Sequence, residues 1–319
     1  METQTEISRD AESIARFVPI ARLKRDIRVM AAKALSLEEG RYLVDLYYQI
    51  QEVRKATANQ IRSMAEVEKD STLLIRWVCE SMELLEAEIT KCLDTFTDGN
   101  PLSRWSKSVV GIGPILSAGL LAHIDISKAE TAGAIWRYAG LDPTMKWEKG
   151  QKRPWNATLK TICWKAAESW VKVQNNENDF YGHLFVKRKA QEVQRNNSGT
   201  FADQARARAT ELEKLHKTTS ESYKWYAGCY PREAAEGFLE LSVDQRAKRL
   251  KKMEVEKGAG LPMLPPAHIH ARATRFVKKI FLSHYFEIGY KILHGKEPPR
   301  PFAQAILGHA HYIAPPGTS

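Results

Sequence analysis

The chain has 319 residues, of which 43% are hydrophobic and 27% charged, and its formal net charge at pH 7 is +10. A chain of this length can hold two or three domains, and the composition is that of a globular protein rather than a disordered or fibrous one. The positive charge favours binding to polyanions, of which nucleic acid is the commonest inside cells. The alternative is a basic surface that only keeps the protein soluble.

The sequence predicts neither a secreted nor a membrane-spanning protein. Its four cysteines are widely spaced and form no Cys-x-x-Cys pair, which argues against a zinc ribbon and a disulfide scaffold. The first six residues are polar and acidic, unlike a signal peptide. The longest apolar stretch, 109–124, is interrupted by glycines and a proline and is shorter than the roughly 20 residues of a membrane span. We expect a cytoplasmic protein with no membrane partner.

Residues 1–35 are predicted to form an N-terminal tail and a basic helix, which contains Arg22, Lys24, Arg25 and Arg28. Residues 36–100 are predicted to form a long helical hairpin. Ser36 and Glu39 begin it with a capping box, in which each side chain bonds to the backbone amide of the other residue.

Apolar residues then recur every three or four positions in two stretches, separated by the polar segment 66–71. The first stripe comprises Leu43, Leu46, Ile50, Val53, Ile61 and Met64, and the second comprises Ile75, Val78, Met82, Leu85, Ile89, Cys92 and Phe96. The simplest fold is an antiparallel, coiled-coil-like pair, which offers an interface for a homo-oligomer. Alternatively, both stripes pack against the rest of the chain.

A helix-hairpin-helix pattern follows, in which two short helices flank a Gly-hydrophobic-Gly turn. The turn is Gly111-Ile112-Gly113, and its isoleucine is expected to point inward. Glycine permits a positive φ and the close approach of a phosphate, and the next helix presents free amide groups. Pro114 suits the first position of that helix, and Ser117 is small enough for close helix contact. The alternative is a turn that only joins two core helices.

The predicted domain that holds this hairpin, residues 101–180, also contains basic residues interleaved with tryptophans. Basic residues neutralise phosphates, and aromatic faces can stack on unpaired bases. The candidate nucleic-acid contacts are therefore Gly111, Ile112, Gly113, Lys146, Lys149, Lys152, Arg153 and Lys160. Trp147 and Trp155 are equally suited to stacking or to core packing, whereas Trp164, among apolar and alanine neighbours, is expected in the core.

Residues 181–319 are predicted to form a helical C-terminal region with a proline-rich tail. A strong helix over 269–293 places apolar residues on one side and basic residues on the other: Arg272, Arg275, Lys278 and Lys279. His284 falls on the apolar side and is expected to be buried and hydrogen-bonded. Few segments of the chain alternate with a period of two, so the sequence predicts a mostly α fold.

Two His-x-His pairs in this region, His268/His270 and His309/His311, are weak candidates for a metal site. Histidine is also common in proline-rich turns, and a metal site needs supporting groups that a sequence does not show. We therefore expect neither a metal nor another cofactor. No Gly-x-Ser-x-Gly, P-loop or Rossmann fingerprint is present.

Three strings occur in the order found in one protein family. They are Gly111-Ile-Gly-Pro, Ile135-Trp-Arg-Tyr-Ala-Gly-Leu-Asp-Pro143, and Asn156-Ala-Thr-Leu-Lys160 before an alanine-rich helix. The segment 105–173 thereby resembles the C-terminal, transposase 20 type domain of the insertion-sequence transposases known for bridge-RNA-guided recombination. The resemblance implies engagement of DNA or RNA in a mobile-element setting and, for whole family members, DNA recombination.

The sequence departs from that family in two places. Family members carry an N-terminal RuvC-like nuclease domain with catalytic carboxylates on and around a β-sheet, whereas the heptad helices take that place here and no strand-borne aspartate motif is found. The family's catalytic serine lies in the loop after the Gly-Leu-x-Pro string. The corresponding segment, 144–155, contains no serine, and Thr144 is its only hydroxyl residue.

Three functions fit these observations. The leading hypothesis is a nucleic-acid-binding protein, with DNA favoured and RNA possible, that grips phosphates through the hairpin without cleaving strands itself. The second is an active or partner-dependent transposase or recombinase with an unrecognised nucleophile. The third is a coiled-coil scaffold whose basic charge is incidental. No catalytic residue is assigned from the sequence.

Overall fold

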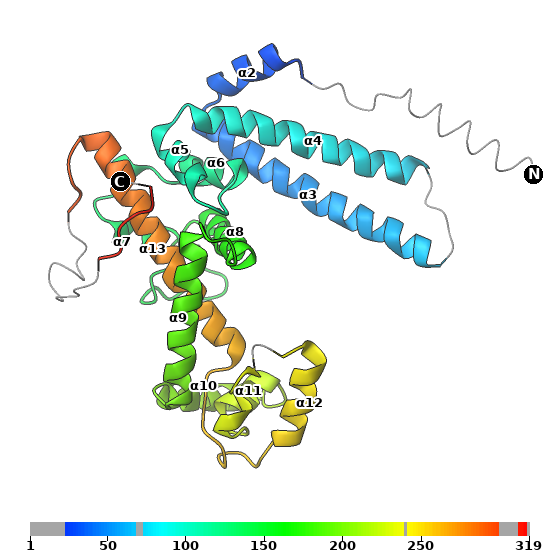
Figure 1. The fold of residues 1–319 in the computed structure, drawn as a ribbon, viewed down its shortest axis with the longest axis vertical. Coiled ribbons are helices and arrows are strands. Elements are labelled where there is room, and N and C mark those ends of the chain that lie inside the picture. The colour runs from blue at the N-terminus through cyan, green and yellow to red at the C-terminus, as the bar shows by residue number, and fades with distance from the viewer. Residues whose placement is uncertain (1–22, 68–72, 239–240, 300–311, 318–319) are drawn as a thin grey trace, which may run out of the picture. The chain divides into compact units, whose positions relative to one another are not determined.

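The computed structural model describes residues 23–67, 73–238, 241–299 and 312–317 (Figure 1). Across these residues it contains twelve α-helices, two short 3-10 helices and no β-strand, which confirms the mostly α fold predicted from the sequence. The chain forms two compact units, unit 1 (Met1–Lys165 and His284–Ser319) and unit 2 (Ala166–Ser283).

Unit 1 contains α2 (Arg25–Ala34), α3 (Leu37–Glu66), α4 (Leu73–Asp98), α5 (Pro101–Ser108), α6 (Pro114–His123), η1 (Ile126–Lys128), α7 (Ala132–Tyr138), the first part of α8 (Ala157–Val173) and the last part of α13 (Pro266–His294). Unit 2 contains the rest of α8 and α13, with α9 (Phe180–Asn197), α10 (Ala202–Lys214), α11 (Glu221–Tyr226), η2 (Arg232–Ala234) and α12 (Val243–Met253). Within the described ranges, no helix is both long enough and apolar enough to cross a membrane.

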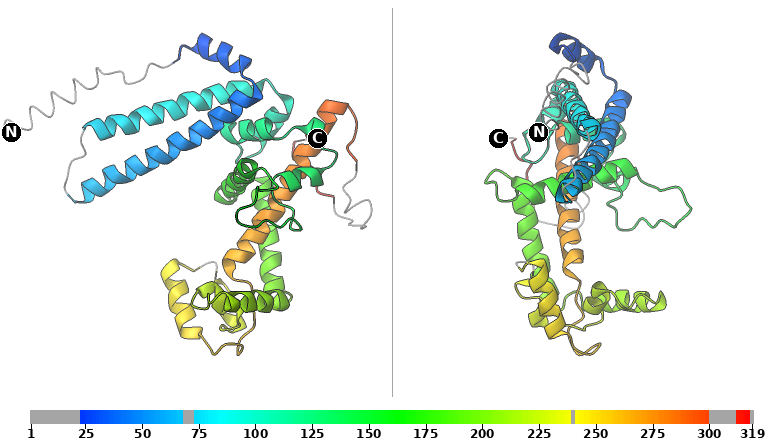
Figure 2. Two further views of the ribbon diagram at one scale, coloured as in Figure 1. Left: turned by 180° about the vertical axis from the view of Figure 1, so that it is seen from behind. Right: turned by 90° about the vertical axis from the view of Figure 1, so that its right-hand side faces the viewer.

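The long helical hairpin predicted from the sequence is formed by α3 and α4, which lie side by side in unit 1 (Figures 1 and 2). The predicted capping box begins α3: the Glu39 amide donates to Ser36 Oγ at 3.2 Å, and the Ser36 amide donates to the Glu39 carboxylate at 2.8 Å. Across the pair, Arg54 Nε donates to the carboxylate of Glu86 at 2.5 Å. The side chain of Glu86 is only 11% exposed, so this ion pair lies within the helix contact.

The apolar stripe predicted for α3 is wrong at Val53, whose side chain is 50% exposed. The buried residues of this helix are Gly40 and Val44. Nine residues at about 100° per residue place Val53 half a turn around the helix from Val44. The buried face therefore follows Gly40 and Val44 and continues through Arg54, and Val53 faces away from it.

Helix α6 packs against both long helices of the hairpin. Ile115 and Ala118 of α6 join Val44, Ile89 and Leu93 in one buried apolar cluster. On its other side, Gly119 lies so close to Ile162 of α8 that an added Cβ would be 2.8 Å from the Ile162 Cδ1 atom. The hairpin thus serves as the platform on which α6 is held.

The end of α13 and the residues 312–317 complete unit 1. His284 is 3% exposed, and its Nε2 atom lies 2.8 Å from the carbonyl oxygen of Ile313, which confirms the expectation of a buried, hydrogen-bonded histidine. The indole of Trp105 on α5 donates to the carbonyl of Pro316 at 3.0 Å. The helix that precedes the Gly-Ile-Gly turn is therefore fixed to residues near the C-terminus.

Unit 2 is held by aromatic packing. Trp170, Tyr181 and Phe281, from α8, α9 and α13, are almost fully buried, with ring centroids 4.8–5.3 Å apart. At the start of α9, buried Asp179 accepts a hydrogen bond from the Gly182 amide at 2.9 Å. A Cβ on Gly182 would lie 2.0 Å from the Asp179 carboxylate, so this cap requires glycine.

Candidate nucleic-acid interface

Helices α5 and α6 meet along a seam of small polar residues. Ser103, Ser106 and Ser117 are fully buried, and the hydroxyl oxygens of Ser106 and Ser117 lie 2.7 Å apart. Ser117 Oγ also donates to the Ser103 carbonyl at 3.2 Å. Short side chains let the two backbones approach, and the hydrogen bonds of the Ser106 and Ser117 hydroxyls offset the cost of burying those two groups. Ser117 provides the close helix contact expected from the sequence.

The turn between these helices uses its two glycines differently. Gly111 has a φ of 89°, a conformation that residues with a Cβ avoid. Gly113 has a φ of −91° and an extended ψ, and nothing lies within 4 Å of a Cβ added there. Ile112 between them is 4% exposed, so its side chain points inward as expected. Gly111 therefore shapes the turn, whereas Gly113 leaves open space beside it.

The open space lies at the N-terminus of α6. Pro114 occupies the first helical position, as expected, and no side-chain cap precedes it. The amide groups of Ile115 and Leu116, the next two residues, consequently have no side-chain acceptor at the cap position. Amide groups at this position of a helix are suited to hold an anion. Because Ile115 packs toward the long hairpin, an anion would approach from the exposed Gly113.

A second candidate surface is the basic loop, which we define as residues 142–156 between α7 and α8. The cations Lys146, Lys149, Lys152 and Arg153 are all exposed. In the described part of the chain none of the four forms an ion pair with a carboxylate. Their charges are therefore not neutralised within the protein and are available to an external anion.

Two tryptophans support the cations of this region. The guanidinium of Arg153 lies 5.2 Å from the ring centre of Trp147, and the Lys160 ammonium on α8 lies 4.4 Å from that of Trp155. The two indoles meet edge to face at 6.4 Å. Cations over an indole face are attracted by its π electrons, so these contacts hold both side chains in place.

The beginning of the basic loop is ordered by Asp142. Its carboxylate accepts from the amide of Thr144 at 2.9 Å and from the Thr144 hydroxyl at 2.7 Å. The Arg137 guanidinium lies 3.3 Å away. The Thr144 hydroxyl and amide, followed by Arg137, lower the pKa of Asp142. Thr144, the only hydroxyl residue of the loop, thus donates a hydrogen bond to a carboxylate whose ionised form is stabilised.

The end of the basic loop is fixed by Asn156, which lies directly before α8. Its Oδ1 atom accepts from the Leu159 amide at 2.9 Å, and its backbone amide donates to the Tyr138 carbonyl at 2.9 Å. Its side-chain amide donates to the Tyr138 hydroxyl at 2.9 Å and lies 3.2 Å from His123 Nδ1. One residue therefore ties the basic loop to the ends of α6 and α7.

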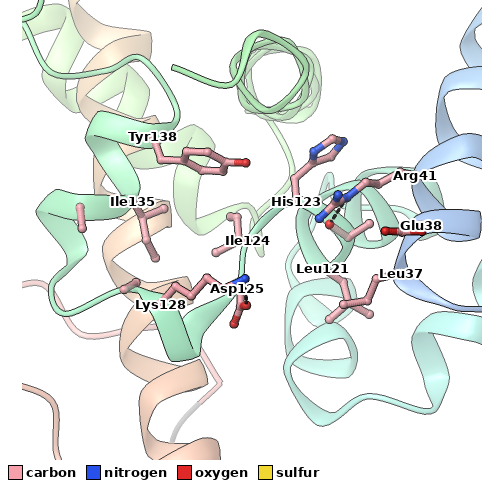
Figure 3. Close-up of a pocket in the computed structure, with 13 residues that line it drawn as sticks. Leu37, Glu38, Arg41, Leu121, His123, Ile124, Asp125, Lys128, Ile135 and Tyr138 are labelled. Carbon is pink, nitrogen blue, oxygen red and sulfur yellow. Dashed lines mark hydrogen bonds and ion pairs between the residues drawn. The ribbon is translucent and has the colours of Figure 1, made fainter. Parts of the chain in front are cut away.

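Beside this junction lies a pocket of about 590 Å³, lined by residues of α3, α6, η1 and α7 (Figure 3). Figure 3 shows Tyr138 pointing across it toward His123 and Arg41. Arg41 Nε donates to the Ala122 carbonyl at 2.5 Å. Burial, followed by the charge of Arg41, lowers the pKa of His123. The pocket therefore presents an imidazole, a phenol and a guanidinium at the end of α6.

The family comparison covers the turn between α5 and α6, the basic loop and part of this pocket. Residues 105–182 match the transposase IS116/IS110/IS902 family. The match spans about a quarter of the chain and supports a transposase-family domain here. Neither the curated proteins nor the solved structures include a significant match to the chain.

Within the transposase-family segment, the structure groups some of the predicted contacts and separates others. Arg153 and Lys160 lie on the adjoining indoles. The backbone hydrogen bonds of residues 111–113, in contrast, join them only to residues of the turn and of α6. The turn is at the N-terminus of α6, and Asn156 is bonded at its C-terminus. A helix of ten residues rises about 15 Å, so about that distance separates the turn from the end of the basic loop that Asn156 fixes.

The core position expected for Trp164 is wrong, because its side chain is 51% exposed. Its neighbours Ile162, Cys163 and Ala166 are buried on one face of α8, and Trp164 falls about 150° from the middle of that face. Trp147, at 37% exposed, and the half-buried Trp155 lie in the basic loop.

The described histidine candidates for a metal site do not converge. His268 Nδ1 lies 3.1 Å from the Tyr226 hydroxyl, whereas His270 packs edge to face on Phe185 and lies 4.0 Å from Glu168. Among the described residues no cluster of histidine, cysteine or carboxylate side chains could hold a metal ion. His309 and His311 lie outside the described residues.

Sequence reasoning missed the junction residues Asn156, His123 and Tyr138, as well as Arg41. Asn156 opens one of the strings of the family resemblance, and its place directly before a helix was a signal for capping. His123, Tyr138 and Arg41 carry no such local signal, because their proximity arises only when three distant segments fold together.

Proposed function

We propose that the transposase-family segment binds nucleic acid, with DNA as the favoured ligand, and does so without cleaving strands by itself. The observation that carries this proposal is the set of four exposed, unneutralised cations on a loop fixed at both ends. The match of the same segment to a transposase family supports it.

The proposed contacts are of two kinds. Lys146, Lys149, Lys152 and Arg153 neutralise backbone phosphates, which releases counterions and makes the affinity depend on salt. The turn at Gly111–Gly113 offers the free amides of α6 to a further phosphate. Both kinds of contact are made with the phosphate backbone of the nucleic acid and not with its bases, so the proposed binding has little sequence specificity.

Binding without cleavage is proposed from the chemistry of the basic loop. Segment 144–155 contains no serine, and the hydroxyl of Thr144 already donates a hydrogen bond to Asp142. Incubation with nicked and intact DNA in the presence of Mg²⁺ or Mn²⁺ tests this part. Cleaved strands or a covalent protein–DNA adduct would support the alternative, an active transposase or recombinase.

The binding test uses the double substitution Lys152→Ala and Arg153→Ala in the full chain. Affinity for short fluorescein-labelled duplex DNA, single-stranded DNA and RNA is measured by fluorescence anisotropy over a range of salt concentrations. We expect about tenfold weaker binding and a salt slope that is smaller by roughly two, because two phosphate contacts are removed.

The matched control is Lys55→Ala with Arg62→Ala, which removes one exposed lysine and one exposed arginine from α3. This control should bind like the wild-type chain. Equal affinity of the loop variant and the wild type would exclude the loop as the contact surface. A wild-type chain that ignores all three ligands at about 0.15 M salt would overturn the proposed function as a whole.

Self-association through residues 36–100 stays a prediction. Its support is the apolar surface that the hairpin leaves uncovered: Val53 and Leu74 are 50% and 66% exposed, and Trp77 is 36% exposed.

A further inference from the structure

Unit 2 carries most of the net positive charge of the chain, although it contains little of the transposase-family segment. Its sequence has three basic residues for every two acidic ones, whereas the charges of unit 1 are close to balance. The described residues of unit 2 lie mainly beyond residue 182, where the family match ends. The loop and hairpin of unit 1 therefore leave most of the excess charge unexplained.

Part of this charge is concentrated where α9 lies beside α13. We define the arginine cluster as Arg188 and Arg195 of α9 with Arg272 and Arg275 of α13. Arg272 Nε donates to the carboxylate of Glu192 at 2.6 Å, and Arg188 forms a second ion pair with the same carboxylate. Arg195 approaches it at 3.8 Å.

Glu192 is the only carboxylate among these ion pairs, and its side chain is 1% exposed. Burial works to raise its pKa, but the hydrogen bond from Arg272 and the three guanidinium charges outweigh burial and lower it. A single ionised carboxylate thus balances one of three guanidiniums. The other two charges, and that of Arg275, are left in excess.

Aromatic rings hold the same arginines in place. The guanidiniums of Arg195 and Arg272 lie 4.8 Å and 4.4 Å from the ring centre of Phe201, and that of Arg188 lies 4.8 Å from the ring of Phe276. The positions of the charged groups are therefore set before any ligand binds.

A neighbouring histidine experiences the excess charge. Burial, followed by the charges of Arg272, Arg275 and Arg208, lowers the pKa of His268. Arg208 forms its own ion pair with Glu211, whereas no ion pair of Arg275 occurs among the described residues. The four arginines repel one another in the free protein because one buried carboxylate offsets only one of their charges, and a bound anion would relieve that repulsion.

We propose that the arginine cluster binds the phosphate backbone of a nucleic acid, with the exposed Arg195 and Arg275 in contact and Arg188 and Arg272 held behind them by Glu192. The planar guanidinium favours phosphate because it can donate two parallel hydrogen bonds to it. The inference rests on the proposed function for the class of ligand, but it assigns a second surface in a different unit.

The test is the double substitution Arg195→Gln and Arg275→Gln in the full chain, which leaves the buried ion pairs of Glu192 with Arg188 and Arg272 intact. Binding to the same labelled DNA and RNA is measured over a range of salt concentrations. We expect about tenfold weaker binding and a salt slope smaller by roughly two. The matched control, Arg206→Gln with Arg232→Gln, removes two other exposed arginines of unit 2 and should bind like the wild type.

The possible outcomes separate this inference from the proposed function. Weaker binding by the cluster variant, with control and thermal melting unchanged, supports the cluster whatever the loop variant does. Wild-type binding that the cluster variant retains in full overturns the inference and leaves the loop proposal standing. Failure of the wild type to bind overturns both.

A free phosphate ion is the other source of the same chemistry. Calorimetric titration with inorganic phosphate distinguishes it from a polynucleotide. Heat that is lost in the cluster variant, combined with unchanged binding to DNA and RNA, would show a site for the small anion and overturn the inference.

Discussion

Gly111 and Gly113 lie two residues apart in one turn, but their backbone conformations differ. The positive φ of Gly111 excludes a Cβ on grounds of conformation, whereas Gly113 has an ordinary φ and open space beside it. Their roles in the free protein can therefore be separated by one pair of substitutions.

We predict that Gly111→Ala lowers the free energy of unfolding by about 1–2 kcal/mol, because alanine at positive φ brings its Cβ too close to the carbonyl. Gly113→Ala should change it by less than about 0.5 kcal/mol. Urea denaturation followed by circular dichroism measures both. Equal losses in the two variants would contradict the assignment of the strained position to Gly111.

The residues that sequence reasoning misplaced share one physical cause. Trp164 has apolar neighbours in the chain and Val53 follows Ile50 by three residues, but burial in a helix depends on the angular position of each residue around the helix axis. Val53 lies opposite Val44, and Trp164 faces away from the buried side of α8. In contrast, the Ser36 capping box was predictable because its partners are three residues apart.

At the scale of the elements, the contact between α3 and α4 combines apolar packing with a partly buried ion pair. Arg54 and Glu86 are 24% and 11% exposed and joined at 2.5 Å. Neither residue belonged to the apolar stripes predicted from the sequence. A sequence pattern indicates which face is apolar, but it does not show which long polar side chains reach across that face.

We predict that Arg54→Met lowers the free energy of unfolding by about 2 kcal/mol, because it leaves the Glu86 carboxylate buried without its partner. Arg54→Met combined with Glu86→Leu should recover most of that loss, since both charges are then absent. Thermal melts of the single and double variants measure the effect. A double variant that is less stable than Arg54→Met alone would contradict this prediction, because the loss of stability could then not come from the unpaired Glu86 carboxylate.

The elements themselves were largely predictable, whereas the pocket and its junction were not. Helix boundaries follow from local caps such as Ser36, Asn100 and Pro114. The pocket at His123 requires α3, α6 and α7 to meet, and the Asn156 hydrogen bonds join residues far apart in the chain. Such long-range contacts leave no periodic trace in the sequence.

At the scale of the whole molecule, one buried and three half-buried histidines make stability depend on pH. The pKa values of His123, His268, His270 and His284 are all lowered, in each case first by burial. The folded chain therefore binds fewer protons than the unfolded chain as the pH falls below the ordinary value of about 6.5. The stability they confer is complete above that pH and is lost progressively as the pH falls.

We predict a lower melting temperature at pH 5.5 than at pH 7.5, and a smaller difference in the variant His284→Asn. The buried His284 faces the Ile313 carbonyl and Glu287, and it accounts for at most about 1.4 kcal/mol at pH 5.5. The lowered pKa of Glu192 acts only below this range, near pH 4.5 and under. Identical pH profiles for variant and wild type would exclude His284 as a contributor.

The contacts of Arg153 with Trp147 and of Lys160 with Trp155 also have an entropic consequence. Immobilising a long, flexible side chain at a binding surface costs about 0.5–1.5 kcal/mol in lost rotamer freedom. Two of these side chains are already restricted by an indole while the protein is unbound. The conformational entropy of these two side chains is therefore lost when the protein folds. Less entropy remains to be lost when a ligand binds to them.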